Sequence, residues 1–277
     1  MKADTEKSTI PKQIIKIKFD GKEEVLDIIA VEEPLEISIS VALAKPPIIN
    51  KNISITMRTP GNDTDLAVGF LFTEGILATA DQIDNISIKE NTVHINLNNS
   101  ENIDLSKLDR HFYTSSSCGV CGKASLEALK TVSLLPPSDA SFQIDKDLLK
   151  TFPDILNQQQ TIFNNTGGIH AAALFDLSGN LLDLREDVGR HNALDKLIGN
   201  CLLNRHFPLD NHILFLSGRA SFELIQKAVM ARIHFITAVG APSSLAVEMA
   251  IEHDVTLVGF LSESRYNIYN GAKRIKI

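Results

Sequence analysis

Short runs of alternating apolar and polar residues dominate the first third of the chain. The run at 14–32, IIKIKFDGKEEVLDIIAVE, predicts two strands that meet at Asp20-Gly21, a residue pair that favours a tight hairpin turn. Further strands are predicted at 35–40, 53–60 and 83–98, the last of these as a second hairpin. This part of the chain is therefore expected to be rich in sheet.

One stretch in this part has helical spacing instead. The segment 63–76, DTDLAVGFLFTEGI, places Leu66, Gly69, Phe70 and Ile76 where they can share one face. We expect Asp63 or Thr64 to cap this helix, since both residue types are common at the N-terminal cap.

The pattern changes after Pro136, the first of two consecutive prolines that suit a linker. We therefore predict a sheet-rich α+β domain at 1–135 and an α/β domain at 136–277. A helical region is expected at 145–168, ending at Gly167-Gly168, and a hairpin at 170–187 turning at Ser178-Gly179.

Strands and helices then alternate to the end of the chain. Helices are predicted at 189–203, 220–232 and 244–253, and continuous apolar strands at 212–218, 235–240 and 255–261. Short apolar strands that alternate with helices are typical of a parallel sheet covered on both faces. The fold class expected for the whole chain is thus mixed α/β.

The ends of these three strands carry similar residues. They read Ser217-Gly218-Arg219, Gly240 to Ser244, and Gly259 to Arg265. In an open α/β sheet, ligands bind beyond the carboxyl ends of the strands, where helix N-termini and arginines favour anions. Arg190 and His191 precede another helix and add positive charge. The alternatives are ordinary loop residues and a solvated network of salt bridges.

Composition and charge narrow the classes of function. The chain has 277 residues, 44 % of them hydrophobic, and its net charge of −7 argues against nonspecific nucleic-acid binding. The polar N-terminus and the lack of a long apolar run predict a cytoplasmic protein that does not insert into membranes. Three cysteines fit a reducing compartment better than a disulfide framework.

Two of the three cysteines, Cys118 and Cys121, lie in a serine- and glycine-rich stretch, TSSSCGVCGK, before a short predicted helix at 124–130. A structural zinc site would need more ligands than this pair and His111 provide. A thioredoxin-like pair should follow a strand, and an incidental pair is also possible. A nucleophilic thiol fits well, because helix N-termini and lysines lower thiol pKa values. Cys201 is expected in the core.

Four segments together carry a resemblance to a known family. The segments SSSCGVCGKASLEAL, TGGIHAAALFDLSGNLLDLREDVGRHNALDKLIG, LSGRASFELIQKAVMARI and TLVGF resemble the formate dehydrogenase accessory sulfurtransferases, FdhD. The resemblance extends over most of the chain, and EDVGRHNALDK together with CGVCG is specific.

The resemblance implies an activity. Members of this family accept sulfur from a cysteine desulfurase and transfer it to the molybdenum cofactor, bis-molybdopterin guanine dinucleotide (Mo-bis-MGD). The cofactor then enters formate dehydrogenase. The persulfide-carrying cysteine corresponds to Cys118, whereas Cys121 could resolve or stabilise the persulfide. The two rival functions are a non-catalytic chaperone for the cofactor and a thiol-disulfide oxidoreductase.

The resemblance also implies where the cofactor binds. The family's segment for it corresponds to Phe260, Leu261, Ser262, Glu263, Ser264 and Arg265, with Arg190, His191, Ser217, Gly218 and Arg219 as weaker candidates. If the segment continues extended, Glu263 and Arg265 share a side, and Glu263 could orient Arg265 or repel phosphate.

The resemblance further implies a homodimer whose larger domain is similar to the cytidine deaminases. Zinc deaminases need a His-x-Glu and a Pro-Cys-x-x-Cys motif. This chain has His170-Ala171-Ala172 and no Cys-x-x-Cys in its α/β half, so we expect no metal.

Overall fold

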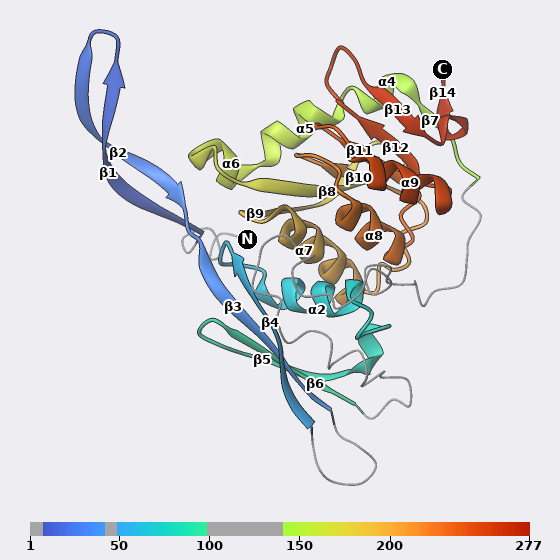
Figure 1. Ribbon diagram of the computed structural model, residues 1–277, viewed down its shortest axis with the longest axis horizontal. Helices are drawn as coiled ribbons and strands as arrows, with labels where there is room; N and C mark the ends of the chain where they lie inside the picture. The colour runs from blue at the N-terminus through green and yellow to red at the C-terminus, as the bar shows by residue number, and fades with distance from the viewer. Residues whose placement is uncertain (1–7, 42–48, 99–140) are drawn as a thin grey trace.

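The computed structural model describes residues 8–41, 49–98 and 141–277, which form a mixed α/β protein with several sheets (Figure 1). Cys118, Cys121, the helix predicted at 124–130 and the domain boundary predicted near Pro136 lie outside the described residues. No helix in the described part of the chain is long and apolar enough to cross a membrane.

The first sheet of the body has four strands in the order β4-β3-β6-β5. Their bounds are Glu33–Val41 for β3, Ile49–Arg58 for β4, Ile83–Lys89 for β5 and Thr92–Leu97 for β6. This arrangement confirms the strands predicted from alternation. Alternate apolar residues such as Leu35, Ile37 and Val93 are fully buried, and they pack in one core with helix α2, Asp63–Thr73.

Helix α2 confirms the predicted helix, but its expected cap is wrong. The cap is Asn62, whose backbone has the left-handed values φ 56° and ψ 34°. The carboxylate of Asp63 is instead taken up by Arg58, which donates from Nε and Nη2 at 3.0 and 2.9 Å.

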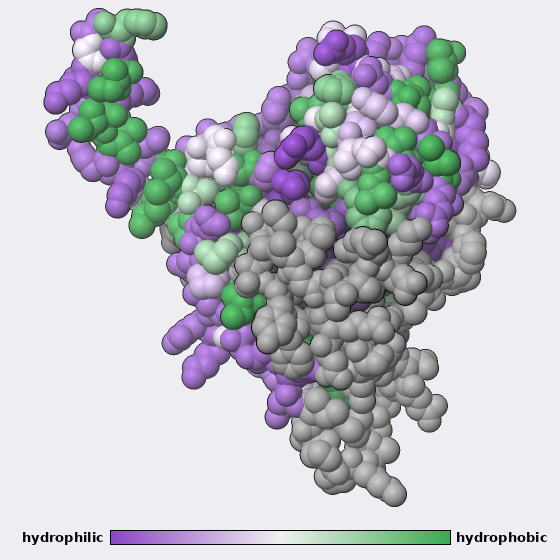
Figure 2. Space-filling view, in the orientation of Figure 1, coloured by the Kyte–Doolittle hydropathy of each residue, from purple (hydrophilic) through white to green (hydrophobic). Residues whose placement is uncertain are grey.

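The predicted first hairpin projects from the body as a separate two-stranded sheet (Figure 1). Strand β1, Thr9–Lys18, pairs antiparallel with β2, Gly21–Ala30, which confirms the turn at Asp20-Gly21. Figure 2 shows apolar side chains along it, and Ile15, Ile17 and Leu26 are exposed by 58, 73 and 72 %. A lone two-stranded hairpin is only marginally stable in water, and these exposed apolar residues contribute little burial to stabilise it.

The second half is built on a six-stranded sheet in the order β13-β12-β11-β10-β8-β9. Its strands are β8 His170–Asp176, β9 Leu181–Asp187, β10 His212–Leu216, β11 Phe235–Ala238, β12 Thr256–Gly259 and β13 Asn267–Asn270. Strands β10, β11 and β12 are parallel, as predicted, whereas β8, β9 and β13 run antiparallel to their neighbours. The sheet is therefore mixed, and the predicted hairpin at 170–187 is confirmed.

Helices cover both faces of this sheet (Figure 1). One face carries α7 Arg190–Leu203, α8 Phe222–Met230 and α9 Ser244–Glu252. The other face carries α4 Lys146–Leu149 and α5 Phe152–Gln159, followed by α6 Thr161–Thr166, which ends at the left-handed Gly167 as predicted. The remaining short elements are β7 Ile144–Asp145, β14 Ile275–Lys276 and the 3₁₀ turns Ala80–Gln82 and Ala272–Arg274.

Helices α2 and α7 pack with their backbones in contact. A Cβ atom on Gly69 of α2 would lie 1.9 Å from the carbonyl oxygen of Asp195, and one on Gly199 of α7 would lie 1.9 Å from that of Asp65. Both positions therefore require glycine. Cys201, two residues farther along α7, is buried in the same core as predicted, and burial raises the pKa of its thiol to about 12.

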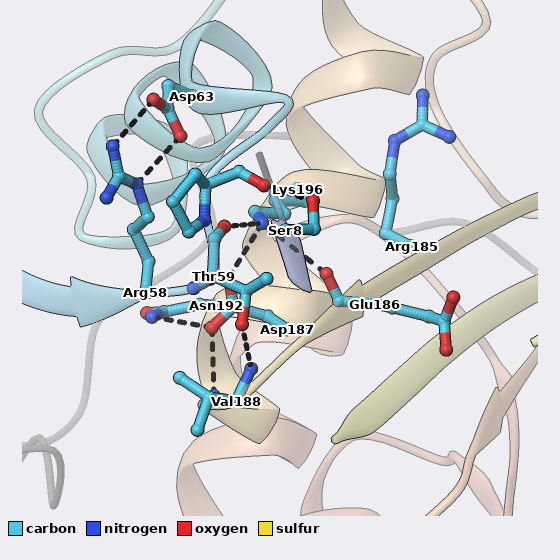
Figure 3. A network of polar contacts seen from close by, with 12 residues as sticks. Ser8, Arg58, Thr59, Asp63, Arg185, Glu186, Asp187, Val188, Asn192 and Lys196 are labelled. Atoms are coloured by element: carbon cyan, nitrogen blue, oxygen red, sulfur yellow. Dashed lines mark hydrogen bonds and ion pairs between the residues drawn. The ribbon is translucent and has the colours of Figure 1, made fainter. Parts of the chain in front are cut away.

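A buried ion pair in the second half of the chain lies close to this helix contact and binds Thr59 of the first half (Figure 3). Lys196 Nζ lies 2.7 Å from Asp187 Oδ2, and the two side chains are 2 and 0 % exposed. Both residues also hold the backbone of Thr59: Lys196 Nζ donates to its carbonyl oxygen at 2.8 Å, and its N–H donates to Asp187 at 3.2 Å. A second buried pair, Lys227 and Asp195, joins α8 to α7 at 2.8 Å.

We predict that Lys196→Met destabilises the protein strongly, because it leaves the carboxylate of Asp187 buried without its counter-charge. Loss of one partner of a buried pair typically costs about 3–5 kcal/mol. Urea unfolding followed by circular dichroism measures the change.

Lys150→Met is the matched control, since Lys150 forms an exposed pair with Asp147 at 2.7 Å. It should leave the free energy of unfolding almost unchanged. Equal stability of the two variants would show that the buried pair does not hold the halves together.

Candidate functional site: a cavity at the carboxyl edge of the sheet

The three predicted strand ends lie side by side. Backbone hydrogen bonds continue the pairing beyond the strands, from Val239 N–H to Leu216 at 3.1 Å and from Gly240 N–H to Gly218 at 2.9 Å. The N–H of Phe260 then donates to the carbonyl oxygen of Gly240 at 3.2 Å. The loops after β10, β11 and β12 therefore form one continuous edge, as expected for parallel strands.

Positive side chains gather beside this edge, around His170 at the start of β8. Burial lowers the pKa of His170, and the charges of Arg190, His191 and Arg219 lower it further. Gly218 is the neighbouring backbone, since a Cβ there would lie 3.3 Å from the His170 ring. The charge of Asp187 raises the pKa of His170, but the other three charged neighbours are basic, so the surroundings of His170 are mainly cationic although the protein as a whole is acidic.

Arg190, His191 and Arg219 form what we call the cationic group. At least one of its nitrogen atoms has no hydrogen-bond partner among the described residues. Arg190 is the first residue of α7, and its Nε is buried without a hydrogen-bond partner among the described residues. His191 Nε2 lies 2.8 Å from Glu223 Oε2 on α8, whereas Glu223 Oε1 is buried and has no hydrogen-bond partner within the part of the chain that the structure describes. A charged donor with an open position next to a basic neighbourhood is suited to an anionic ligand.

A cavity of about 600 Å³ opens next to these residues, between α5–α6 and the strand ends. Its size lies within the range of small-molecule sites. Its lining is Pro153, Leu156, Asn157, Gln160, Phe163, Gly167, Gly168, Ile169, His170, Val188, Phe215, Ser217, Val239, Leu261, Ser262 and Glu263. The wall is thus largely apolar, with a few polar groups, and His170 connects it to the cationic group.

The structure brings some of the predicted site residues into this cavity and leaves others outside its lining. Ser217, Leu261, Ser262 and Glu263 line it. The predicted residues that do not line it are Phe260, Ser264, Arg265, Arg190, His191, Gly218 and Arg219. Among these, Phe260, Ser264, Arg265 and Arg219 are exposed, and the others are partly buried near His170.

The segment after β12 is not extended, so the expected Glu263–Arg265 arrangement is wrong. Phe260 has a positive φ of 53°, and a tight turn follows, in which Ser262 N–H donates to the Arg265 carbonyl oxygen at 2.9 Å. Glu263 instead faces Asp154 on α5. A shared hydrogen bond and the like charge of Asp154 raise the pKa of Glu263.

The wall formed by α5 and α6 is fixed to the sheet by Glu186 of β9. Its two carboxylate oxygens accept hydrogen bonds from the N–H groups of Ile162 and Phe163 at 3.0 and 2.9 Å. This contact gives a fixed position to the first turn of α6 and thereby to the cavity wall.

Sequence patterns did not reveal Gln160 and Phe163 as site residues. Gln160 is the last of three consecutive glutamines, and nothing in the local pattern distinguishes it from Gln158 and Gln159. Val188 also lines the cavity. It lies in the segment REDVGRHN, whose charged residues were the only indication in the sequence that this segment belongs to a site. Within the described residues, no group of three or more His, Cys, Asp or Glu side chains could hold a metal ion.

Comparisons with known proteins agree over nearly the whole chain. Residues 30–276 match the model of the FdhD/NarQ family. A protein named sulfur carrier protein FdhD from Streptomyces coelicolor is 46 % identical over 277 residues, covering 96 % of this chain and 95 % of that protein. A protein of the same name from Sulfurisphaera tokodaii is 40 % identical over 264 residues, covering 95 and 97 %.

A solved structure shares the fold. The crystal structure of a formate dehydrogenase accessory protein from Desulfotalea psychrophila matches with a TM-score of 0.74 and 24 % identity, covering 97 % of this chain and 99 % of that one. The matched family model and the similarity to the named relatives agree with the motifs around Cys118 and in REDVGRHN. The chain belongs to the FdhD/NarQ family.

Proposed function

We propose that this protein is a sulfur carrier in the maturation of formate dehydrogenase. It accepts sulfur on Cys118 from a cysteine desulfurase and transfers it to Mo-bis-MGD, which is its second substrate. The observation that carries the proposal is the sequence similarity to proteins named sulfur carrier protein FdhD, at 46 and 40 % identity over almost the full length.

The loading step is an exchange between sulfur atoms. The Cys118 thiolate attacks the terminal sulfur of the donor's persulfide, the donor's S–S bond breaks, and its thiolate leaves as the Cys118 persulfide forms. No net oxidation occurs, and the rate depends on the thiolate fraction and on access to the sulfur. Cys121 could later attack the Cys118 persulfide, releasing sulfide as a Cys118–Cys121 disulfide forms.

The cavity and the cationic group support binding of the second substrate. The guanine dinucleotide portions of Mo-bis-MGD combine planar bases with phosphates. The apolar walls suit a base, and Arg190 and Arg219 suit phosphates. Leu261, Ser262 and Glu263 place the segment 260–265 at the cavity, with Arg265 exposed at its end.

Four further features are proposed on the basis of the family resemblance. They are a cytidine-deaminase-like architecture for the α/β half, sulfurtransferase activity through a persulfide, a homodimer, and a cytoplasmic location where the donor and formate dehydrogenase are available. Sedimentation of the purified protein tests the homodimer.

We predict that Cys118→Ala abolishes sulfur loading, because it removes the attacking thiolate. The intact protein is incubated with a cysteine desulfurase and cysteine, and its mass is measured. The wild type should gain about 32 Da, one sulfur atom as a persulfide, and peptide mapping should locate it at Cys118.

Cys201→Ala is the matched control and should load like the wild type, since the Cys201 thiol is buried and its pKa is raised to about 12. Loading of Cys118→Ala at the wild-type level, or wild-type formate dehydrogenase activity with that variant, would exclude the carrier role. A pure chaperone would give this second result. If the protein were a thiol-disulfide oxidoreductase, the wild type would form a Cys118–Cys121 disulfide and would not retain sulfur.

We also predict that binding of pyrophosphate raises the pKa of His170. In the free protein, burial and then the charge of Arg190 lower this pKa. An anion held by Arg190 and Arg219 would offset their charges and stabilise the protonated ring. Histidine-selective NMR, with His170→Gln to assign the signal, measures the titration.

Arg190→Gln should raise the pKa of His170 even without an anion. Arg205→Gln should not, since Arg205 is exposed and pairs with Asp81 instead. An unchanged or lower His170 pKa at saturating pyrophosphate would place the anion elsewhere.

A further inference from the structure

A histidine and a glutamate meet where the first turns of α7 and α8 come together. His191 Nε2 lies 2.8 Å from Glu223 Oε2, and the two side chains are only 14 and 17 % exposed. Ser221, the residue before α8, places its hydroxyl oxygen 3.3 Å from the same nitrogen. Two oxygen atoms from the start of α8 therefore face one ring nitrogen of α7.

This contact determines which nitrogen of His191 carries the proton in the neutral ring. An ionised carboxylate can only accept hydrogen bonds, so the nitrogen that faces Glu223 must be the donor. The other nitrogen, Nδ1, makes no hydrogen bond within the described part of the chain. Glu223 thereby leaves Nδ1 as the ring atom that a ligand can engage.

The contacts of Glu223 suit the orientation of this ring better than the support of the fold. Its Oε1 is buried and makes no hydrogen bond to a described residue, so among these residues its carboxylate pairs only with His191. By contrast, Glu186 uses both carboxylate oxygens to hold α6, at 3.0 and 2.9 Å. The difference indicates that the Glu223 side chain serves His191.

The ring that Glu223 holds belongs to the cationic group. Arg190 precedes His191 in α7, and its Nε is buried without a hydrogen-bond partner among the described residues. The charges of Arg190, His191 and Arg219 all act on His170, so these side chains lie around one point. A ligand with several anionic oxygens can therefore accept from Arg190 and from Nδ1 of protonated His191 at the same time.

We propose that Glu223 is a positioning residue that acts through His191. It fixes the ring so that Nδ1 of the protonated imidazole donates to a phosphate group beside Arg190. The class of ligand is a phosphate or pyrophosphate ester. The proposal rests on the proposed function, because the second substrate carries such groups.

Two effects of Glu223 on an anionic ligand have opposite signs. Its carboxylate repels a nearby phosphate, so loss of the charge by itself should tighten binding. Loss of the orienting carboxylate should instead weaken binding, because an amide in its place lets the ring take the wrong tautomer. Glu223→Gln removes the charge with little change in shape, and the direction of its effect therefore separates the two.

Calorimetric titration of the full-length protein with pyrophosphate tests this. Glu223→Gln should weaken binding about tenfold, the usual scale for loss of one hydrogen bond to a charged group. His191→Phe keeps a planar ring without nitrogen atoms and should weaken binding at least as much. The double variant should bind like His191→Phe alone, because Glu223 acts only through the ring.

Glu248→Gln is the matched control, because Glu248 is an exposed glutamate on the neighbouring helix α9 and the variant loses the same charge. It should bind pyrophosphate like the wild type. If Glu223→Gln does not fold, NMR of the wild type decides. The proton of the neutral His191 ring should lie on Nε2, and pyrophosphate should shift the Nδ1 signal more than the Nε2 signal.

Three results would overturn the proposal. The first is a Glu223→Gln variant that binds pyrophosphate as tightly as the wild type or more tightly. The second is a double variant weaker than His191→Phe, which indicates a structural role for Glu223. The third is a wild type that does not bind pyrophosphate or whose neutral His191 ring carries its proton on Nδ1. Sulfur loading on Cys118 is measured separately, so these failures do not coincide with failure of the carrier function.

Discussion

The buried pair between Asp187 and Lys196 is the constraint on which the rest of the structure depends. Both side chains are removed from water, so their charges are tolerated only because they meet each other at 2.7 Å and bind backbone groups of Thr59. Thr59 belongs to the first half of the chain, directly after β4. The pair therefore holds the sheet-rich half against the α/β half at one defined point.

The position of this pair also determines where the site forms. Three consecutive residues at the end of β9 each bind a different element: Arg185 pairs with Asp65 of α2 at 3.3 Å, Glu186 holds α6, and Asp187 holds Thr59. Asp187 also accepts a hydrogen bond from Gly189 N–H at 2.8 Å, just before α7 begins at Arg190. One short segment thus places the helical wall, the cationic group and the junction between the halves.

Much of this fold follows from local pattern. The hairpins at Asp20-Gly21 and Ser178-Gly179, the parallel strands and their shared edge were predicted because each depends on nearby residues or on a general rule of α/β sheets. The burial of Lys196 was not predicted, because a lysine within a helix usually lies in solvent. Its burial is explained only by its partner Asp187, which is distant in sequence.

The site was only partly predictable for the same reason. The turn at 262–265 depends on the Ser262 hydroxyl and backbone bonds, which alternation does not indicate. Gln160 differs from its two preceding glutamines only in that it faces inward at a helix junction. Asn62 caps α2 because the left-handed backbone after Gly61 suits asparagine, whereas Asp63 is engaged by Arg58.

We propose that the carboxyl edge of the sheet binds a nucleotide portion of the cofactor that accepts the sulfur. The most direct measurement is a crystal structure of the full-length protein with bound guanosine diphosphate. We predict that the base lies between α5–α6 and the strand ends and that the phosphates lie beside Arg190. A nucleotide bound elsewhere, or one whose phosphates lie far from Arg190, would contradict this proposal.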